Sequence, residues 1–114
     1  MYRSELELMA AERKLARVRE FESKAMQVQA EAELARVENE VIAAAYAGGK
    51  IDGKNADERK RQESSTLVND AAYQAQVMEV RTCEATAQCD QAEREYQDDL
   101  VSLTKAWLYS QRGD

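Results

Sequence analysis

The chain has 114 residues and a formal charge of −6, and its composition is typical of a helical protein. It contains no proline, no histidine and only four glycines. A compact β-fold needs turn residues at short intervals, which this sequence lacks, so we expect long helices. Histidine is the commonest general base and metal ligand. Without it we expect no enzyme, no metal site and no cofactor.

Charge is unevenly distributed along the chain. Residues 48–62 carry five basic and three acidic residues, whereas the regions on either side have an acidic excess. The overall acidity disfavours extensive binding to nucleic acid, which needs a basic surface. No stretch is apolar enough to span a membrane, so a soluble, cytoplasmic protein without membrane contacts is predicted.

The two cysteines are predicted to be free thiols. Cys83 and Cys89 are six residues apart, which on one helix places them about 9 Å apart along the axis. That distance exceeds the span of a disulfide. We expect both to pack as small apolar side chains in a reducing compartment.

The first predicted helix covers residues 5–47. The motif Ser4-Glu5-Leu6-Glu7 has the spacing of a capping box and predicts the start. Turn chemistry then appears only in residues 48–54, where a glycine in the left-handed region would close the helix. Ile51 would add an apolar contact, and Asp52-Gly53 would form a second tight turn.

A second helix is predicted over residues 56–111 without interruption. Asn55 is a favourable N-cap, and Asp57 and Glu58 suit the positive end of the helix dipole. Two long helices joined by a short loop indicate an all-α fold, an antiparallel two-helix hairpin forming a single domain over residues 1–114.

Apolar residues follow the spacing of three and four that is typical of a coiled coil, and they predict the surfaces on which the two helices meet. On the first helix this stripe comprises Leu8, Ala11, Leu15, Val18, Phe21, Ala25, Val28, Ala32, Ala35, Asn39, Ile42 and Tyr46. On the second it comprises Leu67, Ala71, Gln74, Met78, Thr82, Ala85, Cys89, Ala92, Tyr96, Asp99, Leu103 and Ala106.

These alanine-rich stripes would bury little area in one hairpin, so we expect self-association into a dimeric four-helix bundle or coiled coil. The second helix is expected to be the longer one and to project beyond the first. The projecting end would serve for self-association or for docking another protein, because aromatic side chains are frequent at interfaces. Its residues are Leu103, Trp107, Leu108 and Tyr109.

The basic segment around the loop is a candidate anion site. It contains Lys50, Lys54, Asn55, Arg59, Lys60 and Arg61 at the start of the second helix, where free backbone amides favour an anion. The same residues also have local explanations, since Lys50 complements the end of the first helix and Arg59 can pair with Asp57 or Glu63. A phosphate-binding glycine-rich motif is absent.

Residues 47–59 resemble a segment of small helical proteins from bacteriophages and prophages. The shared pattern is Gly-x-Ile-x-Gly-Lys-Asn-Ala, here Gly49 to Ala56, followed by an acidic pair and an arginine. This resemblance implies a phage accessory protein or host-interaction role, in the cytoplasm of the host cell, and it supplies no catalytic residues.

The sequence therefore predicts a non-enzymatic, homo-oligomeric helical protein that binds another protein, as an inhibitor or adaptor of a host factor. The alternative is an accessory factor for nucleic acid or nucleotides, whose basic loop would bind phosphates.

Overall fold

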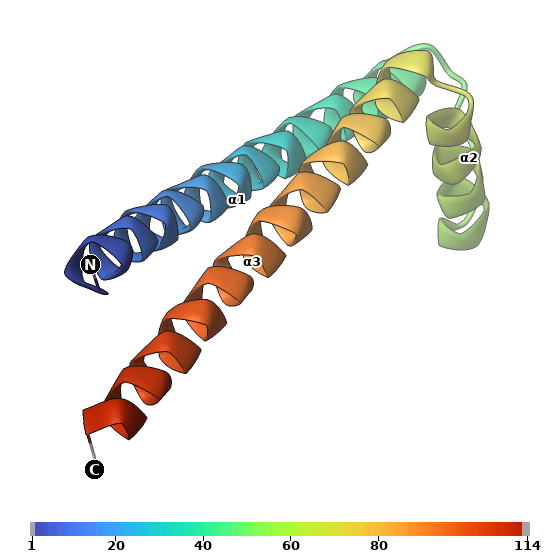
Figure 1. Ribbon diagram of the computed structural model, residues 1–114. Helices are drawn as coiled ribbons and strands as arrows, with labels where there is room; N and C mark the ends of the chain where they lie inside the picture. The colour runs from blue at the N-terminus through green and yellow to red at the C-terminus, as the bar shows by residue number, and fades with distance from the viewer. Residues whose placement is uncertain (1, 113–114) are drawn as a thin grey trace. The chain divides into compact units, whose positions relative to one another are not determined.

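The computed structural model describes residues 2–112, and of residues 2 and 3 only the backbone. Three helices account for nearly all of this part of the chain, α1 (Tyr2–Ala47), α2 (Ala56–Val68) and α3 (Ala71–Arg112) (Figure 1). The all-α fold class is confirmed. Ser4 lies inside α1 rather than at its N-cap, so the predicted start was three residues too late.

The prediction of one uninterrupted helix over residues 56–111 was wrong. The chain leaves the helix at Asn69 and Asp70, although neither glycine nor proline is present there. Asn69 closes α2 through a backbone hydrogen bond to Ser65 O, and its side chain donates to the same carbonyl. Asp70 then caps α3, since its Oδ1 accepts a hydrogen bond of 2.8 Å from the Tyr73 amide.

The end of α1 has the geometry of a Schellman motif. The Lys50 amide donates to Ala45 O at 2.9 Å, and the Gly49 amide donates to Tyr46 O at 3.1 Å. Gly49 has a φ of 74°, in the left-handed region that a residue without Cβ adopts at least cost. The predicted glycine C-cap is therefore confirmed, and the expected apolar residue Ile51 is buried.

Gly53 has a different role from the predicted tight turn. Among the described residues only Gly49 has a positive φ, so Gly53 needs no special backbone conformation. A Cβ at Gly53 would lie 2.8 Å from the Glu58 Cβ, which shows that the loop passes very close to α2. Gln62 fixes this approach, because its Oε1 accepts hydrogen bonds from the amides of Asp52 and Gly53.

The predicted N-cap of α2 is confirmed. Asn55 Oδ1 accepts a hydrogen bond of 2.9 Å from the Glu58 amide. In return the Glu58 carboxylate accepts one from the Lys54 amide. These two bonds satisfy donors that would otherwise be free at the helix start.

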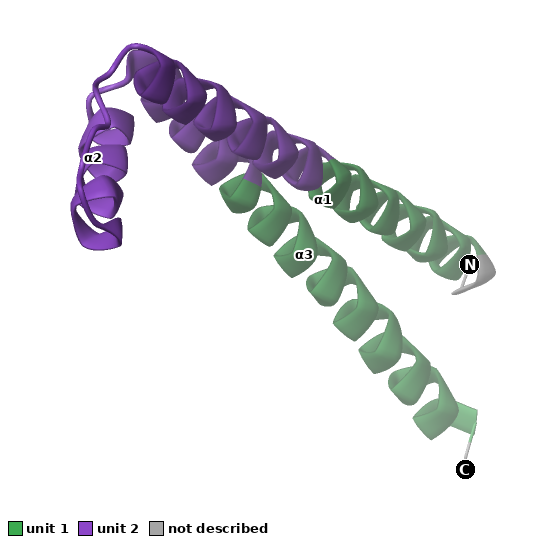
Figure 2. Ribbon diagram, turned by 180° about the vertical axis from the view of Figure 1, so that it is seen from behind, with its two compact units in different colours: residues 1–25, 84–114 green, residues 26–83 purple. Residues whose placement is uncertain are grey.

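The contacts divide the chain into two compact units, each of which pairs a part of α1 with a part of α3 (Figure 2). Unit 1 consists of residues 1–25 and 84–114, and unit 2 consists of residues 26–83, including α2. Each unit is described separately below.

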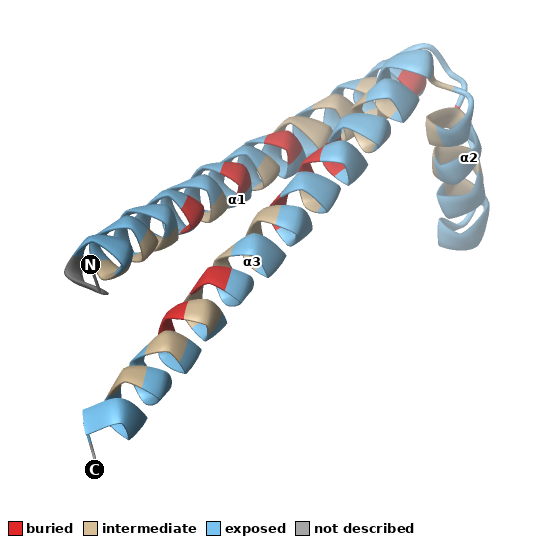
Figure 3. Cartoon of the chain, viewed as in Figure 1, coloured by how far each residue is buried: buried red, intermediate tan, exposed pale blue. Residues whose placement is uncertain are grey.

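In unit 1, small and polar side chains form the surface between the two helices, the unit 1 seam. Ala16 is only 3% exposed, and Ser23, Ala87, Gln97 and Val101 are also buried (red in Figure 3). The inward positions alternate in steps of three and four residues on both helices, as in a coiled coil. They are Leu6, Met9, Arg13, Ala16, Glu20 and Ser23 on α1, and Ala87, Asp90, Arg94, Gln97, Val101, Thr104 and Leu108 on α3.

Unit 2 follows the same pattern with a more apolar centre. Ala30, Val80 and Cys83 form a buried cluster, against which Leu34 packs. The Gln76 side chain donates to the Ala30 carbonyl across the two helices at 3.1 Å. By contrast, none of the residues of α2 is buried. Besides its caps and the loop, a hydrogen bond of 2.6 Å from the Tyr46 hydroxyl to the Glu63 carboxylate joins α2 to α1.

In unit 1 the predicted apolar stripes are not the surfaces on which α1 and α3 meet. The α1 members of the stripe are all exposed there, and so are those of α3 from Ala85 to Ala106. Small residues let two helix backbones approach closely, whereas Leu or Phe at the same positions would hold them apart. The middle of the unit 1 seam therefore pairs small and polar residues, while Leu15, Val18 and Phe21 remain exposed.

We expect Gly49→Ala to lower the free energy of unfolding by about 1 kcal/mol, because alanine is strained at a φ of 74°. Gly49→Asn is the matched control, since asparagine tolerates this conformation better, and it should cost less. Urea denaturation followed by circular dichroism measures both. Equal stability of the alanine and asparagine variants would contradict the role assigned to this backbone conformation.

Candidate interaction surfaces

The outer side of α1 in unit 1 carries a row of apolar side chains. Leu15 is 54% exposed, Val18 43% and Phe21 75%. Val18 is two residues, or about 200° around the helix, from both Ala16 and Glu20 of the seam, so this row faces away from α3. We call it the outer α1 face, and it consists of Leu8, Ala11, Leu15, Val18, Phe21 and Ala25.

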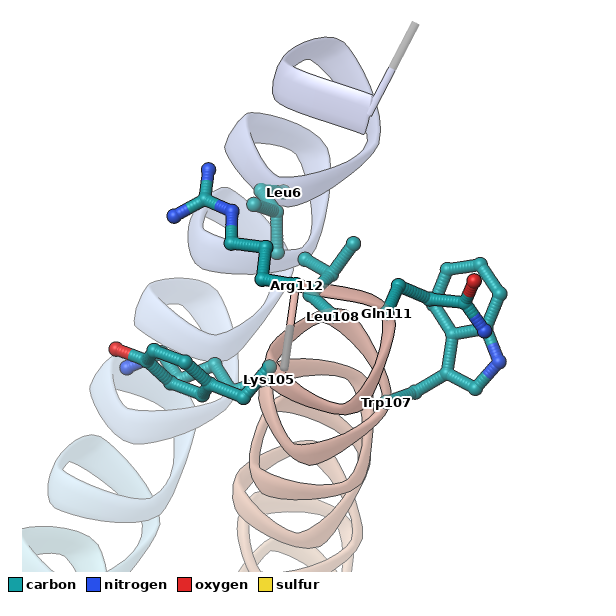
Figure 4. Close-up of a pocket in the computed structure, with 7 residues that line it drawn as sticks. Leu6, Lys105, Trp107, Leu108, Gln111 and Arg112 are labelled. Carbon is teal, nitrogen blue, oxygen red and sulfur yellow. The ribbon is translucent and has the colours of Figure 1, made fainter. Parts of the chain in front are cut away.

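A second apolar cluster lies at the end of unit 1 where α1 begins and α3 finishes. A cavity of about 730 Å³ is lined by Leu6, Lys105, Trp107, Leu108, Tyr109, Gln111 and Arg112. We call it the end pocket. In Figure 4, Trp107 and Gln111 lie together on one side of α3, and Arg112 lies on another. The lining therefore extends around the last turns of α3.

The expected projection of the second helix is not observed. Leu6 of α1 shares the end pocket with Leu108 of α3, and Val101 is buried in the unit 1 seam. The break at Asn69 and Asp70 explains this result, since it leaves α3 with 42 residues beside the 46 of α1. Leu103, Trp107 and Tyr109 are nevertheless exposed.

An ionic network crosses the unit 1 seam. The Arg94 guanidinium contacts the Glu20 carboxylate at 3.2 Å and the Asp98 carboxylate at 3.4 Å. Arg13 and Arg17 of α1 also reach Asp98, at 3.5 and 3.3 Å. The hydrogen bond to Glu20 is the main reason that the pKa of Arg94 is raised, so the guanidinium stays charged.

Sequence reasoning missed this network. Glu20, Arg94 and Arg13 occupy positions of the three-four repeat on which α1 and α3 meet. A prediction based only on large apolar residues overlooks such positions. The sequence feature that indicates the seam is the regular spacing of the small residues Ala16, Ser23 and Ala30, with charged residues between them.

The residues of the basic segment have different local contacts. The Arg59 Nη1 donates to the Gly53 carbonyl at 3.2 Å rather than pairing with Asp57 or Glu63, and Asn55 caps α2. Lys50 lines a separate cavity of about 280 Å³ together with Glu40 and Asp70. The remaining members, Lys54, Lys60 and Arg61, are exposed. Asn55 and Arg59 therefore stabilise the loop and the start of α2 through these contacts.

The two cysteines are free, as predicted, but their environments differ. Cys83 is buried beside Ala30 and Val80, and this burial, together with Glu79, raises the pKa of its thiol. Cys89 is exposed, so the prediction that both pack as apolar side chains was wrong for Cys89. A raised thiol pKa makes Cys83 a poor nucleophile.

Among the described residues, 2–112, no three side chains suited to metal ligation come together. None of the three helices has a segment with both the length and the hydrophobicity that crossing a bilayer requires.

No protein-family model matches this chain, and comparison with curated proteins and with solved structures finds no significant match. The surfaces described above are therefore interpreted from their own chemistry.

We expect Arg94→Met to lower the urea midpoint of unfolding, because it leaves the partly buried Glu20 carboxylate without its partner across the seam. The double variant Glu20→Leu/Arg94→Leu should recover the midpoint, since a packed apolar pair replaces the ion pair. Arg81→Met, at an exposed position, is the control. A loss in Arg94→Met no greater than in this control would contradict the network's contribution.

Proposed function

We propose that the protein is a non-enzymatic helical interaction protein that self-associates and also binds another protein. The observation that carries this proposal is the inverted distribution of apolar side chains in unit 1. Its fully buried apolar residues are Ala16, Ala87 and Val101, whereas eight larger apolar residues are exposed. The exposed set comprises Leu8, Leu15, Val18, Phe21, Tyr96, Leu103, Trp107 and Tyr109.

The energetic consequence favours association. Complete burial of one large apolar side chain stabilises a protein by roughly 1.5–3 kcal/mol. The exposed side chains gain little of this free energy within one chain. Soluble proteins rarely expose a large apolar surface, and where they do, that surface marks an interaction site. Absence of histidine from the sequence supports a binding role over a catalytic one.

The end pocket suits a different partner from the outer α1 face. Its lining combines the apolar Leu6 and Leu108 with the cationic Lys105 and Arg112. Neither cation forms an ion pair with another described residue. An apolar side chain next to a carboxylate on another protein would complement this arrangement.

Self-association through the outer α1 face predicts a mass above 12.9 kDa at micromolar concentration. Val18→Asp should increase the dissociation constant at least tenfold, because the interface would bury a carboxylate. Val68→Asp is the matched control, since Val68 is 66% exposed on α2. Sedimentation velocity measures the masses, and circular dichroism checks that helix content is kept. A wild-type chain that stays monomeric would contradict the proposal.

Trp107 is the only tryptophan and lines the end pocket, so its fluorescence reports on this pocket alone. We expect its emission maximum to stay constant during a dilution series in which the mass falls. That result would leave the end pocket available for another protein. A red shift that follows dissociation would instead assign the end pocket to self-association.

A further inference from the structure

We infer that the partner on the outer α1 face is a second copy of this chain, whose α1 runs antiparallel about a two-fold axis at Val18. This inference rests on the proposed self-association and specifies its geometry. A two-fold interface brings the same surface patch of both copies together, so the patch must complement itself. The outer α1 face meets this requirement in its shape and in its charge.

The apolar residues are arranged symmetrically around Val18. An antiparallel copy centred there places Ala11 level with Ala25, since each is seven residues from Val18. It likewise places Leu15 level with Phe21, each three residues from the centre. Val18, Ala11 and Ala25 lie within about 20° of one line along the helix. These small residues permit a close approach, and Leu15 and Phe21 cover its two sides.

Two charged residues beside the line through Val18 follow the same symmetry with opposite signs. Lys14 precedes Val18 by four residues and Glu22 follows it by four, so each lies level with the other in the antiparallel copy. Neither forms an ion pair with a described residue of its own chain. A parallel copy would instead set lysine against lysine and glutamate against glutamate. Charge therefore selects the antiparallel arrangement.

Charge exchange tests the geometry. Lys14→Glu and Glu22→Lys each turn two attractive pairs per dimer into repulsive ones, and we expect each to raise the dissociation constant about tenfold at low salt. The double variant Lys14→Glu/Glu22→Lys restores both pairs and should bind to within about threefold of the wild type. Lys60→Glu, an equivalent change on the exposed side of α2, is the control. Sedimentation equilibrium measures all four variants.

Disulfide formation supplies a second test that does not depend on charge. Ala11→Cys and Ala25→Cys are prepared separately in a Cys89→Ser background, mixed, and oxidised gently. The antiparallel dimer yields the mixed disulfide between Cys at position 11 and Cys at position 25, because these positions lie level. Mass spectrometry of the linked peptides identifies the product.

The outcomes separate this inference from the proposed function. A wild-type chain that remains monomeric overturns both. A dimer whose single charge variants bind as tightly as the wild type, or whose mixed cysteine variants link only position 11 to 11 and 25 to 25, overturns the antiparallel geometry alone. Failure of the double variant to recover binding while it keeps its helix content also overturns the pairing of Lys14 with Glu22.

Discussion

The close pairing of α1 and α3 through small side chains is the constraint on which the rest of this structure depends. Ala16 and Ala87 in unit 1, and Ala30 in unit 2, are buried. Such positions let the helices approach but contribute little apolar area and few interlocking shapes. A seam of this kind has little resistance to sliding, so its register needs another determinant. The charged residues of the unit 1 seam supply it.

The network around Arg94 distinguishes the observed register from its neighbours. Because the helices are antiparallel, a slip of one heptad would bring Arg94 level with Arg13 in one direction and with Gln27 in the other, in place of Glu20. The first slip places two guanidinium groups together, and the second removes the carboxylate partner. The half-buried charges of this network thus favour one register over its neighbours. Replacing them with packed apolar residues would keep or raise stability but would remove this preference. The orphaned Oε1 of buried Gln97 marks a further cost of this polar seam.

The parts of the fold that local chemistry determines could be predicted from the sequence. The left-handed glycine after α1 and the Asn55 cap of α2 depend on residues within a few positions of each other, and both were confirmed. The break at Asn69 and Asp70 is also local, yet it lacks glycine and proline. Its signal was the pair of adjacent residues that both favour caps over helix interiors. Sequence reasoning gave more weight to the long apolar periodicity that runs through them.

The surface between the helices could not be predicted in the same way. Each helix in unit 1 carries two stripes with three-four spacing, one small and polar and one large and apolar. Periodicity detects both but does not state which one meets the partner helix of the same chain. Hydrophobicity selects the larger stripe, and this choice was wrong for the α1–α3 seam. It identifies instead the face for which we propose a second chain.

The break between α2 and α3 has a consequence for the far end of unit 1. A helix running on from Ala56 to Arg112 would exceed α1 by about three turns at 3.6 residues each. Residues from Val101 onward would then have no α1 beside them. With the break, Val101 is buried, and Leu108 lines the end pocket together with Leu6. The caps formed by Asn69 and Asp70 thus have an effect on the last turns of α3. These turns line the end pocket instead of forming a free helix end.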